Sequence, residues 1–567
     1  MISRTLAFVA FALSASFLPP AVSAREPDVA SAGVVSSADP RAAAAGQEIL
    51  RKGGNATDAA LAMMIALTVV EPHNSGIGGG GFLLHHGGKT GVLDTIDGRE
   101  AAPAAATPDR FMGPDGKPLP FIQAWPGGYS VGVPGNLRLA AMAHEKWGKL
   151  PWADLFGPAI RLAEDGFEVR QRLYTALKAV EPIWKDFPEI QKMYWKDGAP
   201  VPIGTILRNP PLAALFRRIA AEGPDAFYLG ENARAISAAV TNAPKNPVPL
   251  TEADLAAYRA KERPAICGHY RAYTICGMGP PSSGAVTVLE VLGMVERFDL
   301  KKWGKDNPLS WHVIGEAMQL AYADREKYLG DPDFVKMPIA GMIDPAYLAR
   351  RSRLISLTKT LPSYEAGTPP GAEPRTAAIS SEVAGTSHFV AIDHDGDIVS
   401  MTSTIESFFG SQLVANGFSL NNELTDFTFA PEKDGAPVAN RVEAGKRPLS
   451  SMSPVIVYDA AGKPIFTVGA AGGKTIIMQV AKALIAHFDW GISAQDSIAM
   501  GLIFFNKDGL VLEQGTNLEP MKPALEKLGH TVSVAKMGLK ANAAERLPDG
   551  KWIGAADPRS PGVSLQE

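Results

Sequence analysis

The sequence predicts an α/β protein in which helices and strands follow one another along the chain, and three segments carry this prediction. Residues 135–235 repeat apolar side chains at helical spacing. Residues 386–404 predict two strands around an Asp395-Gly396 turn. Residues 464–488 predict a strand, a glycine turn and a helix. A length of 567 residues permits several domains or one large α/β fold.

The amino-acid composition excludes some classes of function. With 46% hydrophobic and 20% charged residues, the chain is an ordinary globular sequence. Its formal net charge of -4 provides no basic surface for nucleic acid. We therefore expect no nucleic-acid partner.

The first 24 residues have the pattern of an export signal. Arg4 supplies the positive charge, residues 5–18 are largely apolar, and Val22-Ser23-Ala24 gives a small-x-small cleavage pattern. The alternative of a membrane anchor is disfavoured because the apolar run is shorter than a bilayer requires. We expect an exported, periplasmic protein without a membrane anchor, from which the signal peptide, residues 1–24, is removed.

Two helices are expected directly after this segment. The first opens at Asp39-Pro40 and ends at Gly53-Gly54. Asn55 caps the second helix, with Asp58 at its third position, and this helix stops at Glu71-Pro72. A glycine-dense turn and a strand follow.

The chain has two cysteines, Cys267 and Cys276, in a segment that predicts a hairpin turning near Tyr270-Arg271. A hairpin would bring the thiols close enough for a cross-strand disulfide in an oxidising compartment. Two separate buried thiols remain an equal alternative. A zinc site is disfavoured because no second Cys or His pair lies at ligand spacing.

Residues 361–385 differ from the rest of the chain, since they are rich in Pro, Gly, Ser and Ala and poor in large apolar residues. This composition predicts an extended segment that ends at the first residue of a strong strand. It is either a domain linker or a processing site. Further along, the glycine turn at 469–473 comes directly before a helix, where unpaired backbone N–H groups suit an anion or a developing oxyanion.

Eight short motifs, each weak by itself, become specific through their order and spacing. They are EPHNSGIGGGGF at 71–82, GRE at 98–100, PPSSG at 280–284, TSHF at 386–389, NNELTDF at 421–427, KRPLSSMSP at 446–454, GAAGGKTII at 469–477 and DPR at 557–559. Together they resemble the γ-glutamyltransferase family of N-terminal-nucleophile hydrolases, from about Ala30 to Arg559.

The resemblance implies both a fold and a maturation step. The fold is a four-layer αββα sandwich, with two stacked, mainly antiparallel sheets between layers of helices. The precursor cuts itself between Gly385 and Thr386 by an N-to-O acyl shift. A large subunit, residues 25–385, and a small catalytic subunit, residues 386–567, then form a heterodimer. Gly385 is plausible before the cut because a residue without Cβ tolerates a strained backbone.

The resemblance also implies the catalytic residues. Thr386 is the nucleophile, and its new α-amino group, with a reference pKa of about 7.7–8.0, is the base. Thr404 hydrogen-bonds the nucleophile, and Gly472 and Gly473 supply the oxyanion hole. A nucleotide-binding loop is the rival interpretation of GGKT, but its first glycine position is occupied by Val468.

Recognition of a γ-glutamyl group requires partners for one carboxylate and one ammonium. Arg99 matches the family arginine that binds the α-carboxylate, which a guanidinium can do through two hydrogen bonds. The serines that add further donors correspond to Ser450 and Ser451. The positions that hold the α-ammonium correspond to Glu406, Glu423 and Asp426. Without the family, each charged residue would be taken for a solvated surface group.

The chain departs from many family members in three places. Glu406 and Glu423 replace Asn and Gln, which we interpret as variation within the activity. Residues 427–446 form a short segment without Tyr, which predicts an open site that admits bulky substrates. Residues 537–546 differ from the pattern expected in the small subunit, and the sequence offers no reason. We treat the serines of the PPSSG motif, Ser282 and Ser283, as structural.

The histidines indicate no metal site, because His73, His85, His86 and His388 lack metal-ligand spacing. We expect His388 to pack beside the start of its strand.

The leading hypothesis is transfer of γ-glutamyl groups from glutathione and related amides to water or to an amino acid or peptide amine, without a metal or organic cofactor. A related acylase that removes glutaryl groups is the closest alternative. Such a substrate lacks the ammonium that would neutralise the carboxylates expected in the pocket. A second alternative is a binding protein without catalysis, which the matching threonines and glycines disfavour.

Overall fold

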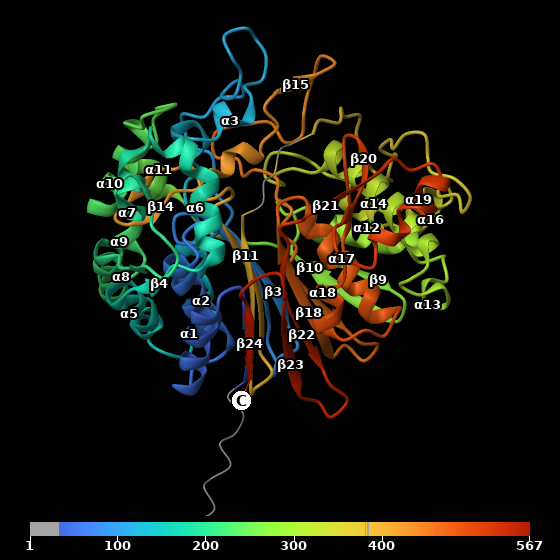
Figure 1. Ribbon diagram of the computed structural model, residues 1–567, viewed down its shortest axis with the longest axis horizontal. Coiled ribbons are helices and arrows are strands. Elements are labelled where there is room, and N and C mark those ends of the chain that lie inside the picture. Colours follow the sequence, from blue (N-terminus) through green and yellow to red (C-terminus); the bar gives the residue numbers. More distant parts are fainter. Residues whose placement is uncertain (1–32, 380–381, 383–384, 567) are drawn as a thin grey trace, which may run out of the picture.

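The structure is a four-layer sandwich of two sheets between two groups of helices (Figure 1). This computed structural model describes residues 33–379, 382 and 385–566. The predicted α/β fold with an αββα arrangement is therefore confirmed. The predicted signal peptide, residues 1–24, lies outside the described residues. In the described part of the chain, no helix has the length and apolar character needed to cross a membrane.

The first sheet has seven strands in the order β24-β1-β11-β12-β2-β3-β8, and all of its pairs are antiparallel. Its strands are β1 (Gly33–Ser37), β2 (Gly80–His86), β3 (Leu93–Asp97), β8 (Lys261–Glu262), β11 (Ser387–Asp393), β12 (Ile398–Thr404) and β24 (Val563–Gln566). The predicted strand pair of residues 386–404 forms its centre.

The second sheet has six strands in the order β23-β22-β18-β17-β10-β9, also antiparallel throughout. Its strands are β9 (Ile266–Tyr270), β10 (Tyr273–Gly277), β17 (Val455–Tyr458), β18 (Pro464–Ala471), β22 (Lys540–Arg546) and β23 (Trp552–Ala556). Strand β11 packs against β18 and β22, so the two sheets are stacked face to face. The stack buries an apolar core.

One group of helices covers the outer face of the first sheet, where α1 packs on β1 and α2 packs on β11 and β12. Every residue of α2 is buried, as expected for a helix that is apolar on all sides. The group comprises α1 (Pro40–Arg51), α2 (Ala56–Val70), α4 (Asn136–Trp147), α5 (Gly157–Asp165), α6 (Gln171–Trp184), α7 (Pro188–Tyr194), α8 (Pro210–Glu222), α9 (Asp225–Tyr228), α10 (Gly230–Thr241) and α11 (Glu252–Ala257).

The other group covers the second sheet, with α12 packed on β9 and α17 packed on β18. It comprises α12 (Gly284–Val295), α13 (Leu300–Trp303), α14 (Pro308–Tyr328), α15 (Ile339–Met342), α16 (Pro345–Ser352), α17 (Thr475–Phe488), α18 (Ala494–Ala499) and α19 (Lys522–Lys527).

Several short helices and strands complete the fold. They are α3 (Phe121–Ala124) and the strand pairs β4 (Phe167–Glu168) with β7 (Ile206–Leu207), β5 (Trp195–Lys196) with β6 (Ala199–Pro200), β13 (Val414–Ala415) with β14 (Phe418–Ser419) and β15 (Glu432–Lys433) with β16 (Ala436–Pro437), and the three strands β19 (Ile503–Asn506), β20 (Gly509–Glu513) and β21 (Val532–Ala535).

The first two helices begin directly after their predicted capping residues. The side chain of Asp39 accepts a hydrogen bond at the start of α1. Asn55 and Asp58 form a reciprocal capping box at the start of α2, which satisfies two backbone N–H groups. Both helices therefore begin where the sequence predicts.

The predicted hairpin of residues 266–277 is formed by β9 and β10, in which Cys267 lies opposite Cys276. The structure joins the two cysteines by a disulfide, with S–S 2.06 Å. The predicted extended segment also lacks helix and strand over residues 361–379. The hairpin carries no predicted site residue, whereas the extended segment ends at Gly385, directly before Thr386.

Candidate active site

Thr386 lies directly before β11, at the centre of the first sheet, and it is only 3% exposed. Its N–H donates to the carbonyl of Asn74 at 3.0 Å. Its hydroxyl donates to the hydroxyl of Thr404 at 3.0 Å. Its φ of 93° lies in a region that β-branched residues rarely adopt, so the backbone is strained here.

Thr404 is the last residue of β12, the neighbour of β11. The pairing of Ser387 with Ser403 places residues 386 and 404 at the same end of the strand pair. The Thr404 hydroxyl also accepts the N–H of Glu406 at 2.8 Å. The two predicted threonines are thus in direct contact, and a backbone donor fixes the second one.

Gly385 has no room for a side chain. A Cβ at this position would lie 1.5 Å from the carbonyl oxygen of Glu406. Backbone strain was the reason expected for this glycine, but the positive φ belongs to Thr386. The physical reason for glycine is therefore close approach of the backbone of residue 406.

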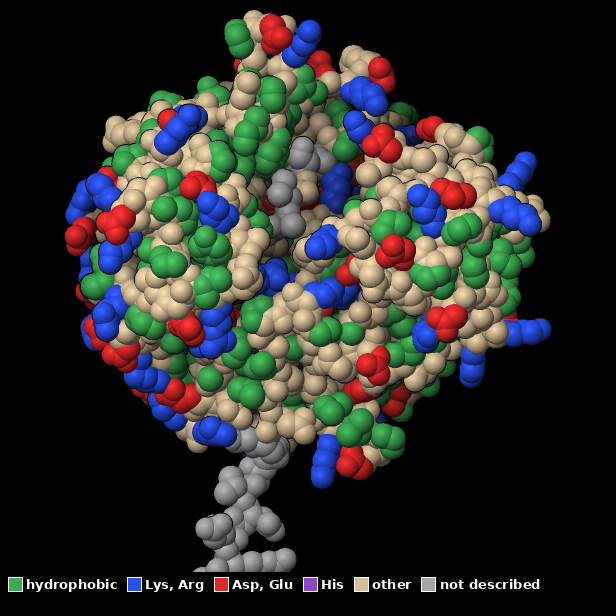
Figure 2. Space-filling view, in the orientation of Figure 1, with side chains coloured by type: hydrophobic (Ala, Val, Ile, Leu, Met, Phe, Trp, Pro, Cys, Tyr) green, Lys and Arg blue, Asp and Glu red, His purple; other side chains and the backbone are tan. Residues whose placement is uncertain are grey.

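Gly385, beside the predicted nucleophile, and Gly472, from the predicted oxyanion hole, line the same cavity of about 480 Å³. Gly472 and Gly473 connect β18 to α17 and have φ values of 137° and 57°, which favour glycine. The cavity is further lined by Asn74, Arg170, Gln171, Arg172, Thr175, Phe408, Ala471, Gly538, Arg559, Ser560 and Pro561. In Figure 2 the molecule is hollowed near the centre of this face, with Lys and Arg side chains at the border.

The predicted ammonium partners form one buried cluster. Glu406, Glu423 and Asp426 each place a carboxylate oxygen within 4.8 Å of the others. Arg99 forms an ion pair with Glu423 and a second, of 2.6 Å, with Asp426. It also donates from Nε to Pro448 at 3.1 Å and from a terminal nitrogen to Leu449 at 2.9 Å. The Arg99 guanidinium therefore gives these hydrogen bonds to carboxylate and carbonyl groups of the protein.

Two carboxyl groups of this cluster have pKa values above their usual range. Burial raises the pKa of Glu423 and of Asp426 well above the usual range, although Arg99 opposes the rise. Burial also raises the pKa of the adjacent Glu100 to about 7. Arg99 pairs with Glu423 and Asp426, and an ammonium bound beside these two groups would favour their ionised forms further.

The two predicted serines lie on a tightly held loop. The hydroxyl of Ser451 accepts a hydrogen bond from Arg325 at 3.0 Å. The carbonyl of Ser450 accepts both the N–H and the hydroxyl of Ser283, each at 2.7 Å. Ser282 donates to the carbonyl of Met452 at 2.7 Å. Ser282 and Ser283 therefore support the loop, in the structural role expected of them.

Residues 537–546, for which the sequence offers no reason, contain strand β22 and a buried ion pair. Lys540 Nζ lies 2.7 Å from Glu71 and donates to the hydroxyl of Ser387 at 3.1 Å. Burial alone would raise the pKa of Glu71, but Lys540 and neighbouring charges lower it to about 2. Burial lowers the pKa of Lys540 to about 8. This ion pair hydrogen-bonds the side chain of Ser387, the residue that follows Thr386.

His388 packs within the first sheet, as expected. Its Nδ1 lies 2.9 Å from the Thr402 hydroxyl. A Cβ on Gly469 would lie 2.3 Å from the His388 ring, so the ring fills the space beside that glycine. Burial lowers the pKa of His388 to about 3.

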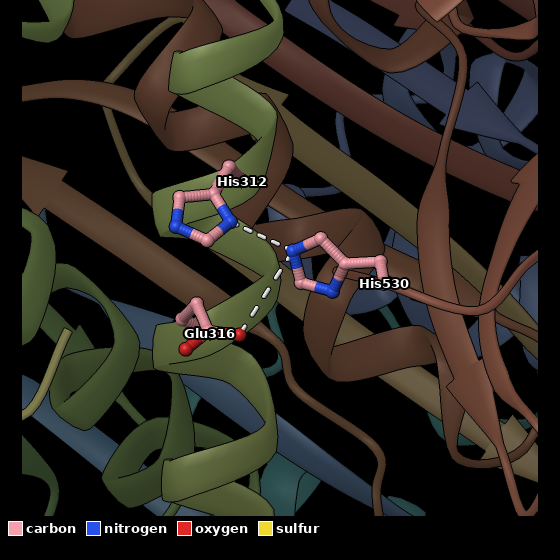
Figure 3. A group of neighbouring side chains, drawn as sticks. All are labelled: His312, Glu316 and His530. Carbon is pink, nitrogen blue, oxygen red and sulfur yellow. Dashed lines mark hydrogen bonds and ion pairs between the residues drawn. The ribbon is translucent and has the colours of Figure 1, made fainter. Parts of the chain in front are cut away.

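A separate cluster joins α14 to the loop before β21 (Figure 3). His312 Nε2 donates to the carbonyl of Ser356 at 2.7 Å, and Nδ1 lies 2.7 Å from His530 Nε2. Glu316 accepts hydrogen bonds from the side chain of Thr360, the N–H of Leu361 and the hydroxyl of Tyr364. The ligand atoms that a metal would need already hydrogen-bond to protein groups, so we assign the cluster a structural role.

Four residues beside the candidate site have no role in the sequence-based prediction: Asn74, Arg325, Glu382 and Lys540. Asn74 lies within a quoted motif, but its carbonyl, which no side-chain pattern reveals, makes the contact. Arg325 is a buried charge on a long helix, where an exposed position is the usual expectation. Glu382 and Lys540 lie in segments with no periodic pattern.

Two stacked antiparallel sheets between helix layers, with a threonine directly before a central strand, form the arrangement of an N-terminal-nucleophile hydrolase. A family model described as Gamma-glutamyltranspeptidase matches residues 42–566. The chain belongs to this family.

Individual relatives agree with the family. A glutathione hydrolase proenzyme of Bacillus subtilis (strain 168) is 35% identical over 558 residues, which cover 95% of this chain and 92% of the relative. One of Escherichia coli (strain K12) is 36% identical over 541 residues, covering 93% and 90%. Among solved structures, a cephalosporin acylase from Bacillus halodurans has a TM-score of 0.83 at 26% identity, covering 97% of this chain and 99% of its own.

Proposed function

We propose that this chain is a γ-glutamyltransferase and glutathione hydrolase that activates itself by cutting the bond between Gly385 and Thr386. The observation that carries the proposal is the pairing of Thr386 with Thr404 at 3.0 Å, in a chain whose adjacent Gly385 lines a cavity together with Gly472. The family match and the proenzyme names of the relatives support both the activity and the maturation.

Self-cleavage begins with the hydroxyl of Thr386. Its oxygen adds to the carbonyl of Gly385, the C–N bond breaks, and the acyl group moves from nitrogen to oxygen as an ester. Water then hydrolyses the ester, which leaves a carboxylate on Gly385 and an amino group on Thr386. The strained φ of 93° at Thr386 supports this site of cleavage, since strain that the cut releases favours the reaction.

The mature reaction uses the new amino group as a base. It takes the hydroxyl proton of Thr386 while the oxygen attacks the side-chain carbonyl of the γ-glutamyl donor. The amides of Gly472 and Gly473 stabilise the oxyanion, and the leaving amine takes the proton. The γ-glutamyl ester is then attacked by water or by an acceptor amine, which restores Thr386. This scheme uses no metal or organic cofactor.

The donor is proposed to bind through its charges. Glu406, Glu423 and Asp426 hold the α-ammonium, and the loop of Ser450 and Ser451 receives the α-carboxylate. Arg99 orients the carboxylates and remains our candidate for a direct contact with the donor once the site is occupied. Its ion pairs with Glu423 and Asp426 support the orienting role.

A glutaryl acylase is the second candidate, favoured by the similarity to a cephalosporin acylase structure. The buried carboxyl groups of Glu423 and Asp426 favour a donor with an ammonium instead, because an ammonium beside them would stabilise their ionised forms. A γ-glutamyl anilide and a glutaryl anilide, which differ in that ammonium, discriminate the two. We expect kcat/KM to favour the γ-glutamyl anilide; preference for the glutaryl anilide would reject the proposal.

Cellular setting and access to the site belong to the same proposal. The apolar segment of residues 5–18 supports export to the periplasm. A bond between Cys267 and Cys276 agrees with an oxidising compartment. Residues 427–446 contain the short β15–β16 hairpin, which supports an open site for bulky substrates.

A further inference from the structure

The cavity that Gly385 and Gly472 line lies beside the reacting groups, but the proposed scheme gives it no ligand. Among the described residues that line it, none belongs to the set proposed to bind the donor's ammonium and α-carboxylate. A γ-glutamyl donor carries those two charges at one end and its leaving amine at the other, with the reacting carbonyl between them. The cavity is therefore available to the leaving amine. An acceptor amine attacks the ester from the position that the leaving amine has vacated, so the same cavity receives both.

Three of the described residues that line this cavity are arginines, and the protein uses them to different extents. Arg559 donates from all three of its nitrogens to two carboxylates and one carbonyl of the protein. Arg170 is half exposed and lies 3.8 Å from the equally exposed Glu168. Arg172, the second residue of α6, differs from both, because no group in the described part of the chain accepts a hydrogen bond from its side chain.

The Arg172 guanidinium is thus the charged group of the cavity with donors to spare. Its Nε is buried without a hydrogen-bond acceptor, although the side chain as a whole is 27% exposed. Its ion-pair partner among the described residues is Glu71, and Nε lies 4.0 Å from that carboxylate, which is too far for a hydrogen bond. A buried donor without an acceptor carries a desolvation penalty that a bound acceptor would remove.

The charges around Glu71 leave one cation without a carboxylate of its own. Lys540 Nζ donates to Glu71 at 2.7 Å, and Ser387 donates to the same oxygen. Burial lowers the pKa of Lys540 to about 8 although Glu71 opposes the shift, and the positive charge of Arg172 adds to the lowering. Two cations therefore share one carboxylate, and an additional anion in the cavity would be attracted to Arg172.

We propose that Arg172 binds a carboxylate on the leaving amine of the donor, and afterwards on the acceptor amine, so that the enzyme favours amino acids and peptides over amines without a carboxylate. This inference rests on the proposed function. The leaving amine of glutathione is cysteinylglycine, which carries such a carboxylate. A guanidinium with spare donors holds a carboxylate through two parallel hydrogen bonds, and the bound anion also balances the second cation beside Glu71.

The test compares two acceptors, glycylglycine and glycylglycinamide, which differ in the terminal carboxylate. The donor is a γ-glutamyl anilide, because its leaving aniline has no carboxylate. We expect kcat/KM of the mature protein to favour glycylglycine at least about tenfold, and Arg172→Met to reduce this preference to about twofold or less. Arg217→Met, which removes an exposed arginine paired with Glu164, is the matched control and keeps the preference. Equal use of both acceptors by the unchanged protein, or an undiminished preference in Arg172→Met, would overturn the inference.

A conservative variant separates binding from a structural role. Arg172→Lys keeps the positive charge beside Glu71 and loses the planar fork, so we expect a preference between those of the unchanged protein and Arg172→Met. It also replaces Arg172→Met in the comparison if the methionine variant does not mature, as its intact mass would reveal. Equal losses on the two acceptors would contradict binding of a carboxylate by Arg172.

The leaving amine gives an independent measurement that does not depend on transfer. Glutathione and its glycyl amide differ in the same carboxylate, and we expect Arg172→Met to reduce kcat/KM at least about fivefold more for glutathione than for the amide. Turnover of the γ-glutamyl anilide without any preference for a carboxylate would reject this inference and keep the proposed function. Turnover of a glutaryl anilide alone would reject the proposed function, and the same two acceptors would then test Arg172 with the glutaryl donor.

Discussion

At the scale of single residues, two different constraints meet at the bond proposed to be cut. Thr386 has the strained φ, whereas Gly385 lies against the carbonyl of Glu406. Strained conformations of this kind cost on the order of 1–3 kcal/mol. The surrounding contacts from Asn74 and Thr404 hold Thr386 in place despite this cost.

The crowding at Gly385 gives the first prediction. Gly385→Ala introduces a Cβ that would lie 1.5 Å from the Glu406 carbonyl, so the backbone must move. We expect the half-time of self-cleavage, followed by denaturing electrophoresis, to lengthen at least about tenfold, because the shift displaces the scissile bond from the Thr386 hydroxyl. Gly157→Ala, where a Cβ meets only the end of Arg161 at 3.5 Å, is the control. Cleavage of Gly385→Ala at the normal rate would show that the contact is irrelevant.

The carboxylate cluster gives the second prediction. Asp426→Asn removes the carboxylate that would pair with the bound ammonium, and hydrogen bonds to charged groups contribute about 1.5–3 kcal/mol. We expect kcat/KM for a γ-glutamyl anilide to fall about tenfold to hundredfold, with a much smaller effect on a glutaryl anilide. Asp434→Asn, on the exposed turn between β15 and β16, is the control. Equal losses on both anilides would argue against recognition of the ammonium.

At the scale of elements, the strand pairs and helices that position the site were predictable, and the polar contacts between them were not. The pair β11–β12, the strand-turn-helix of β18 and α17, and the caps of α1 and α2 each have a local signature. The pair of Lys540 with Glu71 joins positions far apart in sequence, so no local pattern indicates it. The same holds for Glu382 with Arg325.

The third prediction concerns how β22 is fastened to the end of α2. Lys540→Met leaves Glu71 buried without its partner, so we expect a loss of about 3–5 kcal/mol in the free energy of unfolding. Glu71→Gln/Lys540→Met should recover part of this loss. Lys522→Met, in an exposed pair with Glu526, should cost less than about 0.5 kcal/mol. Denaturant titration of the uncut Thr386→Ala protein measures all three, and a double variant as unstable as the single one would contradict this role of the pair.

The fourth prediction concerns pH and the buried strand residue His388. Its folded pKa, lowered by burial to about 3, lies below the unfolded value near 6.5. Only the unfolded chain takes up a proton between these values, so the free energy of unfolding falls as pH falls from 6.5, by about 1.4 kcal/mol per pH unit from this group. We expect His388→Gln to flatten this fall in the free energy of unfolding between pH 6.5 and 5. An unchanged slope in His388→Gln would contradict the assignment.

At the scale of the whole molecule, the position proposed for the cut does not divide the fold. The first sheet takes β1, β2, β3 and β8 from before residue 386 and β11, β12 and β24 from after it. The second sheet takes β9 and β10 from before it and β17, β18, β22 and β23 from after it. Each sheet therefore joins both proposed subunits through backbone hydrogen bonds and a shared core.

The sequence could predict this architecture only through its resemblance to a family, because the strand order depends on pairings between distant segments. Strand β1 pairs with β11 and with β24, more than 500 residues further along the chain. Periodicity finds such strands one at a time and does not choose their partners. The family motifs supplied the arrangement, and the structure adds the contacts between the motifs.

Self-cleavage before Thr386 is tested most directly by the mass and N-terminal sequences of the purified protein. We predict two fragments under denaturing conditions, the smaller beginning at Thr386, that elute together as one particle under native conditions because their strands share both sheets. A single chain that stays intact on incubation would contradict self-cleavage at this bond, and with it the role of Thr386 as nucleophile.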